Sequence, residues 1–308
     1  MDFASFDTMT IGGLTLYEIV WFFLIYSFIG WVLEVIYNAA AEGHVINRGF
    51  LNGPVCPIYG FGMVGLLILI GTLFPQGAEH VNAVLLFLIG LVLATALELF
   101  GGWILDKLFH ARWWDYSNKP FNLNGYICPE FSIYWGLGAV FVLRIFHPFI
   151  ADVTVKIWPK EIGWPVAIIL CVIYLADTIV TTMIVVGLNK ELAKLDDLRT
   201  EMRKVSDELS NVLGTQSIKT FQRMEEGRVQ AELMRDSIQD QVGSVIEEKR
   251  DELQAKKEEI LKEQEELYHR LLSGKVFGPR RLFKAFPDMK IPDHKELLED
   301  IKARIRKA

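Results

Sequence analysis

Five long apolar stretches dominate the first 188 residues of this 308-residue chain. A membrane-spanning helix needs roughly 20 apolar residues at a rise of 1.5 Å per residue. A chain inside lipid must also satisfy its backbone hydrogen bonds internally. The sequence therefore predicts an all-α polytopic membrane protein with five transmembrane helices. The predicted spans are residues 14–37, 57–74, 80–108, 131–150 and 163–188.

The charged residues divide the chain into two parts. Residues 1–188 contain 7 Lys and Arg and 13 Asp and Glu, whereas the remaining residues contain 25 basic and 25 acidic side chains. We therefore expect a transmembrane domain over 1–188 and a charged, soluble region beyond it. Neither part has the basic excess of a general nucleic-acid binder, so no nucleic-acid partner is expected.

An internal repeat lies within the apolar part. Residues 30–57 return at 102–129 with a constant offset of 72, so that Gly30 to Glu34 corresponds to Gly102 to Asp106. Parallel repeats about an axis along the membrane normal are a design of transport proteins. We expect two parallel helical-hairpin repeats, a fifth span and a role in transport.

Positively charged residues predict which ends of the spans face the cytoplasm. The segment before the first span has no Lys or Arg, whereas Arg48 lies in the 38–56 loop and Arg112 in the 109–130 loop, and five follow between 190 and 204. By the positive-inside rule the N-terminus lies outside and the C-terminus and both loops are cytoplasmic. We expect a multi-pass protein of the cell membrane, embedded in the lipid bilayer, without a cleavable signal peptide.

Ionisable residues inside the spans are the first candidates for function, because burying them in lipid is costly. Glu34 and Asp106 occupy equivalent repeat positions, and Glu98 lies two helical turns before Asp106 on nearly the same face. We expect these carboxylates to converge on a cytoplasm-facing site for a substrate or ion; the alternative is a set of structural ion pairs. The candidate site residues are Glu34, Arg48, Asn52, Glu98, Asp106, Asp115 and Asn124.

The repeated loops contain turn-forming and helix-starting residues. Asn-Gly pairs tolerate positive φ, and a proline suits the first turn of a returning helix. We expect Asp115 to pair with Arg112 or Arg48, and the aromatics beside it to lie in an interfacial belt. Two thiols are too few for a zinc site, so neither a metal nor another cofactor is expected. The residues predicted to shape the loops are Gly53, Cys56, Pro57, Gly125, Cys128 and Pro129.

The charged tail has two predicted parts. Leu195, Leu198, Met202 and Val205 follow heptad spacing, which predicts charged coiled-coil helices over 189–273 that either set the oligomeric state or dock a partner. Residues 274–308 form a basic and aromatic tail. Its basic residues favour either an anionic membrane surface or a packed connecting segment; they include Lys275, Arg280, Arg281 and Lys284.

No recognised catalytic motif is present. The chain lacks a P-loop, an H-E-x-x-H and a G-x-S-x-G sequence, so we do not expect an enzyme. Two alternatives to a transport protein remain. One is a membrane-embedded enzyme acting on a lipid-like substrate, and the other is a membrane sensor or scaffold acting through its cytoplasmic coiled coil.

Several runs resemble one family of bacterial membrane proteins. They are Gly30-Trp31, Asn47 to Leu51, Cys56 to Gly62, Glu98, Trp114-Asp115-Tyr116 and Ile127-Cys128. The family is called putative ABC-transporter type IV, or putative ABC transporter permease, and the resemblance covers about residues 15–185. It implies a separate nucleotide-binding ATPase subunit. Five spans are few for a complete pore, so a permease of this kind is expected to be a homo-oligomer.

Overall fold

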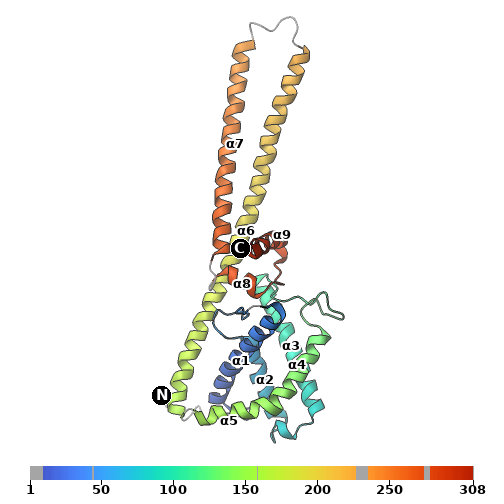
Figure 1. Cartoon of the computed structure of the whole chain (residues 1–308), viewed down its shortest axis with the longest axis vertical. Helices are drawn as coiled ribbons and strands as arrows, with labels where there is room; N and C mark the ends of the chain where they lie inside the picture. The colour runs from blue at the N-terminus through green and yellow to red at the C-terminus, as the bar shows by residue number, and fades with distance from the viewer. Residues whose placement is uncertain (1–9, 44, 158, 227–234, 274–277, 308) are drawn as a thin grey trace. The chain divides into compact units, whose positions relative to one another are not determined.

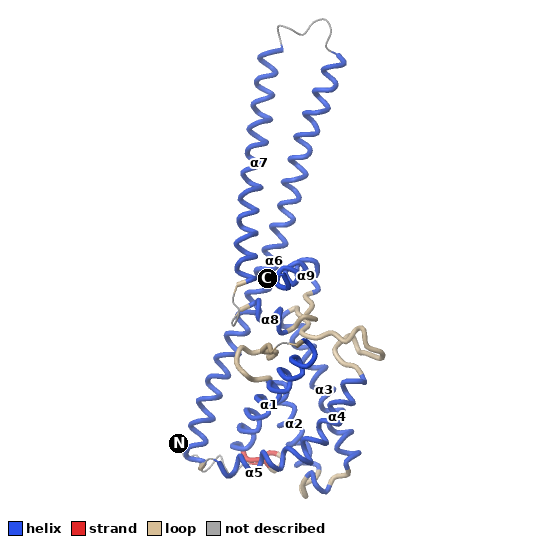
Figure 2. Tube along the Cα trace, viewed as in Figure 1, coloured by secondary structure: helices blue, strands red, loops and turns tan. Residues whose placement is uncertain are grey.

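The computed structural model describes residues 10–43, 45–157, 159–226, 235–273 and 278–307, and this part of the chain is almost entirely helical (Figure 1). A short hairpin of β1 (Thr10–Ile11) and β2 (Leu14–Thr15) precedes the helices (Figure 2). The α-helices are α1 (Leu16–Glu42), α2 (Pro57–Leu73), α3 (Ala83–Phe109), α4 (Pro129–Phe141), α5 (His147–Ile157), α6 (Lys160–Glu226), α7 (Arg235–Leu272), α8 (Pro279–Ala285) and α9 (Lys295–Lys307). Short 3-10 helices η2 (Ala78–His80) and η4 (Pro292–His294) and a π-helical turn η3 (Val142–Phe146) complete the structure.

The chain forms two compact units. The first, here called the apolar unit, comprises Met1–Gly187 and Gly274–Leu298. The second, the charged unit, comprises Leu188–Ser273 and Glu299–Ala308. The segment 278–298 therefore groups with the apolar helices, although the whole charged hairpin separates them in sequence.

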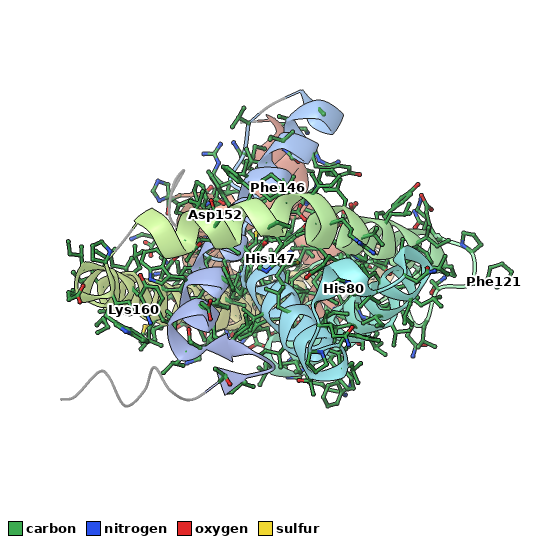
Figure 3. The ribbon with its side chains drawn as sticks, turned by 90° about the horizontal axis from the view of Figure 1, so that it is seen from below. His80, Phe121, Phe146, His147, Asp152 and Lys160 are labelled. Carbon is green, nitrogen blue, oxygen red and sulfur yellow. The ribbon has the colours of Figure 1, made fainter. Side chains whose placement is uncertain are left out.

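In the apolar unit, α1 packs against α2 and α3 packs against α4. Phe22, Leu66, Leu86 and Leu143 lie in one buried cluster drawn from these helices and η3. His147 lies inward among the helices (Figure 3), where its Nδ1 is 3.0 Å from the Tyr26 hydroxyl. The helices are thus joined by apolar contacts and a few polar side chains.

Four described helical segments are long and apolar enough to cross a membrane. They are Leu16–Ala40, Ala83–Phe109, Pro129–Thr154 and Lys160–Val212. The remaining apolar helix, α2, has 17 residues, which is at the lower limit for a span. The structure thus confirms an all-helical chain with several membrane-length apolar helices, and α2 as a fifth span stays a prediction.

The charged unit contains two long antiparallel helices, α7 and the second half of α6 (Figure 1). Glu191 pairs with Arg270, whereas Glu208, further along α6, pairs with Lys249, earlier on α7. Of the residues predicted at heptad positions, Leu195, Leu198 and Val205 are buried and Met202 is half-buried. On α7, Leu253, Ile260 and Leu267 are also buried. The coiled coil itself stays a prediction.

Candidate functional site

Glu98 is a buried carboxylate near the middle of α3. Only 6% of the surface of Glu98 is exposed. The Tyr116 hydroxyl donates to Glu98 Oε1 at 2.9 Å, and the Trp135 side chain of α4 interacts with the same carboxylate. Burial and then the charge of Glu98 raise the pKa of Tyr116, so its hydroxyl retains the proton that it donates.

Glu34 on α1 contacts aromatic side chains that also lie beside Glu98. The Tyr59 hydroxyl donates to Glu34 Oε1 at 2.7 Å, and the Tyr59 ring packs edge-on against Trp135 with centroids 5.5 Å apart. Trp135 in turn reaches Glu98. The structure therefore brings Glu34 and Glu98 together through side chains of α2 and α4.

Gly30 explains the position of Tyr59. A Cβ atom added to Gly30 would lie 2.2 Å from Tyr59 Cγ, so any larger residue would displace the ring. Glycine destabilises the interior of a helix, but here it allows α1 and α2 to approach each other closely. Gly30 thereby maintains the Glu34–Tyr59 hydrogen bond.

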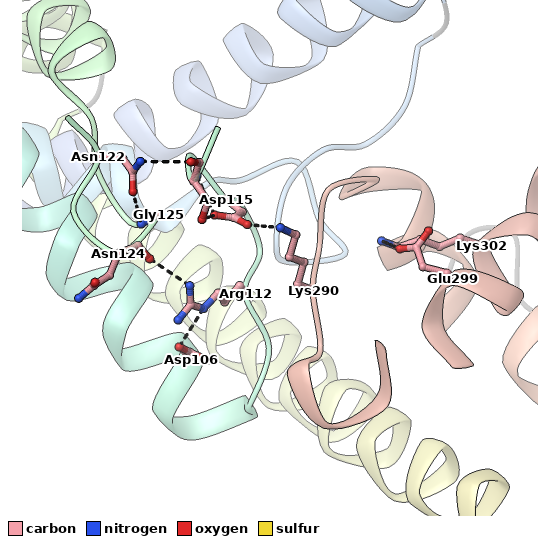
Figure 4. A network of polar contacts seen from close by, with 10 residues as sticks. Asp106, Arg112, Asp115, Asn122, Asn124, Gly125, Lys290, Glu299 and Lys302 are labelled. Carbon is pink, nitrogen blue, oxygen red and sulfur yellow. Dashed lines mark hydrogen bonds and ion pairs between the residues drawn. The ribbon is translucent and has the colours of Figure 1, made fainter. Parts of the chain in front are cut away.

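Asp106 lies in a different group at the end of α3. It accepts hydrogen bonds from Arg112 Nε at 3.2 Å and from the Tyr126 hydroxyl, and Arg112 also donates to Asn124 O at 3.0 Å (Figure 4). Eight residues separate it from Glu98, which is about 12 Å along a helix. Asp106 and Glu98 thus have different hydrogen-bond partners, and the convergence of the three carboxylates on one site stays a prediction.

Each repeated carboxylate nevertheless has an arginine from the loop that follows it. Arg48 Nε lies 4.0 Å from Glu34 Oε2, and Arg112 Nε lies 3.2 Å from Asp106 Oδ2. The two pairs satisfy one carboxylate on α1 and one on α3.

Asn52 does not meet Asn124. Its backbone N–H and its side-chain amide donate to Asp177 Oδ1 on α6 at 3.2 and 3.0 Å, and Gly53 N–H donates to Asp177 Oδ2 at 2.7 Å. The second corner is different, because Asn124 and Gly125 have positive φ values of 51° and 76°. Asn52 and Gly53 lack positive φ, so only the second corner is the left-handed turn that both Asn-Gly pairs predict.

Asp115 pairs with Lys290, which contradicts the expected partners Arg112 and Arg48 (Figure 4). Burial by itself would raise the pKa of Asp115, but hydrogen bonds from Lys290 and Ser117 outweigh it and hold that pKa below its usual value. The neighbouring Trp113 is buried, with its ring 5.0 Å from Phe50 and 5.1 Å from Phe286. Trp113 therefore packs inward and does not belong to an exposed interfacial belt.

The C-terminal segment 278–298 binds both repeated loops. Arg281 on α8 is 5% exposed, and its guanidinium donates to Gly49 O and Phe50 O at 2.8 Å each. Lys290 and Arg112 exchange two backbone hydrogen bonds of 2.8 and 2.9 Å. The sequence shows this basic and aromatic cluster but not the loop residues that it contacts. Of its described basic residues, Arg281 is buried, Arg280 is half-buried and Lys284 is exposed, whereas Lys275 lies outside the described part of the chain.

The Cys-Pro pairs start two helices as expected. Cys56 and Cys128 are the N-caps of α2 and α4, with Pro57 and Pro129 in the first turn. Both thiols are buried and free. Across the described residues, no group of three or more His, Cys, Asp or Glu side chains is arranged to hold a metal ion.

A family model described as putative ABC-transporter type IV matches residues 21–182. This match covers more than half of the chain, so the protein belongs to that family and the resemblance noted from its motifs is confirmed. No curated protein and no solved structure matches the chain. The matched region contains every candidate site residue, from Glu34 to Asn124.

Proposed function

We propose that this member of the putative ABC-transporter type IV family is the membrane subunit of a transporter that works with a separate nucleotide-binding ATPase. Glu98 is the observation that carries the proposal. A buried carboxylate in the middle of an apolar helix is costly and characteristically marks an ion or substrate path. The chain has no P-loop of its own, so ATP hydrolysis falls to the partner.

The Tyr116 hydroxyl supplies a link between the loop and this path. Tyr116 lies in the loop between α3 and α4 and donates directly to Glu98. A movement of that loop would therefore alter the hydrogen bonding of a buried carboxylate. Coupling of this kind requires the loop to face the ATPase. We propose that both the 38–56 and the 109–130 loops are cytoplasmic, where such an ATPase would bind.

The two carboxylate–arginine pairs support a repeated architecture. Glu34 with Arg48 and Asp106 with Arg112 follow from equivalent positions, and each carboxylate also accepts a tyrosine hydroxyl. We propose five spans, with α2 as the second, and an outside N-terminus. The charged helices form a coiled coil that joins copies of the chain or docks the ATPase.

Purification from native membranes in mild detergent tests the partner. An ATPase recovered in fixed ratio, identified by mass spectrometry, is the expected result. A chain that purifies without any nucleotide-binding protein would contradict the proposal. It would favour a membrane enzyme or a scaffold instead.

The Glu98→Gln variant tests the path. We expect the purified complex to keep its ATPase companion but to lose most of its ATP hydrolysis in lipid, because the amide cannot exchange a proton or hold a cation as the carboxyl group beside Tyr116 and Trp135 can. Glu79→Gln is the matched control, since that side chain is 70% exposed in the η2 turn. Unchanged hydrolysis in Glu98→Gln would remove this carboxylate from the mechanism.

A further inference from the structure

A polar cavity lies at the C-terminal end of α3, beside the loop that follows this helix. Its volume is about 640 Å³ and it is open to the surroundings. The lining residues are Trp103, Asp106, Lys107, Arg112, Ser117, Asn122, Asn124 and Tyr126. All of them belong to the apolar unit.

The charges that line this cavity do not balance. Asp106 is paired with Arg112 at 3.2 Å, which leaves the Lys107 ammonium as the excess charge. Within the described part of the chain, neither Lys107 nor the Asn124 side-chain amide has a hydrogen-bond or ion-pair partner. A cation and an amide donor thus face the same open cavity, which suits an anion that accepts hydrogen bonds.

Exposed apolar side chains lie next in sequence to residues that line the cavity, and Trp103 itself lines it. Trp103 and Leu108 on α3 are 48% and 66% exposed, and Phe121 and Leu123 in the following loop are 91% and 51% exposed. Figure 3 shows Phe121 at the edge of the molecule, pointing away from the helices. Large apolar groups around a charged cavity at the end of a membrane-length helix fit the level of the lipid headgroups.

We propose that this cavity binds the phosphate headgroup of an anionic membrane phospholipid, with the acyl chains along the exposed side of α3. Basic pockets between spans on the cytoplasmic side are suited to such headgroups. The negative end of the α3 dipole opposes an anion, so binding depends on the Lys107 ammonium, with the Asn124 amide as a further donor. The inference rests on the proposed membrane placement, and it is independent of the ATPase partner.

Thermal unfolding of the full chain in detergent tests the site. Short-chain phosphatidylglycerol is titrated against phosphatidylcholine with the same acyl chains and against inorganic phosphate. We expect phosphatidylglycerol alone to raise the unfolding temperature. Equal stabilisation by phosphatidylcholine would show that the negative charge is not read, and equal stabilisation by phosphate would show an anion site without a lipid; either result overturns the proposal.

Two variants locate the binding. Lys107→Gln should weaken phosphatidylglycerol binding about fivefold, the effect of one basic residue near the headgroups. Asn124→Asp places a negative charge in the cavity and keeps a residue that tolerates positive φ, so it should weaken binding further. Equal unfolding temperatures without lipid would show that both variants are folded.

Lys119→Gln is the matched control. It removes the same charge from the loop that follows α3, but Lys119 is already paired with Glu130 at 2.9 Å and does not line the cavity. If Lys119→Gln weakens binding as much as Lys107→Gln, the lipid responds to overall charge and the proposed site is wrong. If phosphatidylglycerol does not stabilise the natural chain although the ATPase is still attached, this inference alone is refuted.

Discussion

The Asp177 carboxylate on α6 accepts a hydrogen bond from the backbone N–H of Gly53 at 2.7 Å, across 124 residues of sequence. The same carboxylate accepts from the backbone and side chain of Asn52. Three donors of one corner are thus satisfied by one acidic residue. This explains why the corner at Asn52-Gly53 needs no left-handed backbone, whereas the corner at Asn124-Gly125 does.

Replacing Asp177 should release the first corner. In Asp177→Ala, three hydrogen bonds to a charged acceptor disappear, and each such bond contributes about 1.5–3 kcal/mol. We expect Cys56, now buried three residues beyond Gly53, to react at least about tenfold faster with a maleimide. Mass spectrometry of the labelled peptide separates Cys56 from the other cysteines.

The control for Asp177→Ala lies one position further along α6. The Thr178 hydroxyl donates to Tyr174 O within its own helix, so Thr178→Ala should leave the labelling of Cys56 unchanged. Unaltered Cys56 labelling in Asp177→Ala would mean that other contacts hold the corner.

Arg281 should prove essential for holding the 38–56 loop. Arg281→Met leaves Gly49 O and Phe50 O without their guanidinium donors, and unsatisfied buried groups cost about 1–3 kcal/mol each. We expect limited trypsin treatment to cleave after Arg48 at least about fivefold faster than in the natural chain. Arg281→Lys should rescue only partly, because an ammonium lacks the planar fork that reaches two carbonyls.

Lys284→Met provides the comparison for Arg281. Lys284 lies on the same short helix but is exposed, so its loss should not change cleavage after Arg48. Resistance of Arg281→Met to trypsin would show that the loop keeps its fold without α8.

The Asp115–Lys290 pair should make stability depend on pH. The pKa of Asp115 in the folded chain lies below its unfolded value, so the pair stabilises the fold fully above the unfolded pKa of about 3.9. That stabilisation is lost as the pH falls through the folded pKa. Asp115→Asn should therefore lower the unfolding temperature at pH 7 and have a smaller effect near pH 3.

Thermal unfolding in detergent between pH 3 and pH 7 measures this difference. Asp288→Asn in the same C-terminal segment serves for comparison, because Asp288 is exposed. A temperature difference between Asp115→Asn and the natural chain that stays constant over this range would exclude the ion pair as its source.

Several features of the site follow from local sequence. The Cys-Pro pairs at Cys56 and Cys128 start helices because proline suits the first turn. Asn124-Gly125 forms a left-handed turn, since both residues tolerate positive φ. The contact between Glu34 and Arg48 is also local, because only 14 residues separate this helical carboxylate from the arginine of the following loop.

Other contacts carry no local signature. Asp115 has an arginine three residues away, yet it pairs with Lys290 because segment 278–298 brings that side chain closer. Glu98 and Asp106 share one helix but not their hydrogen-bond partners, since Tyr116 and Tyr126 come from different points of the same loop. Periodicity alone predicts which residues share one face of a helix. It does not predict which side chains from other segments contact that face.

The sequence by itself determined the helical class, the membrane-length apolar segments and the family, because burial in lipid demands long apolar runs whose backbone bonds are local. Only the tertiary structure decided that Asp177 holds the Asn52 corner and that Arg281 holds the Gly49 loop. Arg281 and Asp177 act on backbone groups, which every residue possesses. A carbonyl or an amide N–H leaves no mark in the sequence, so its partner becomes visible only when the chain is folded.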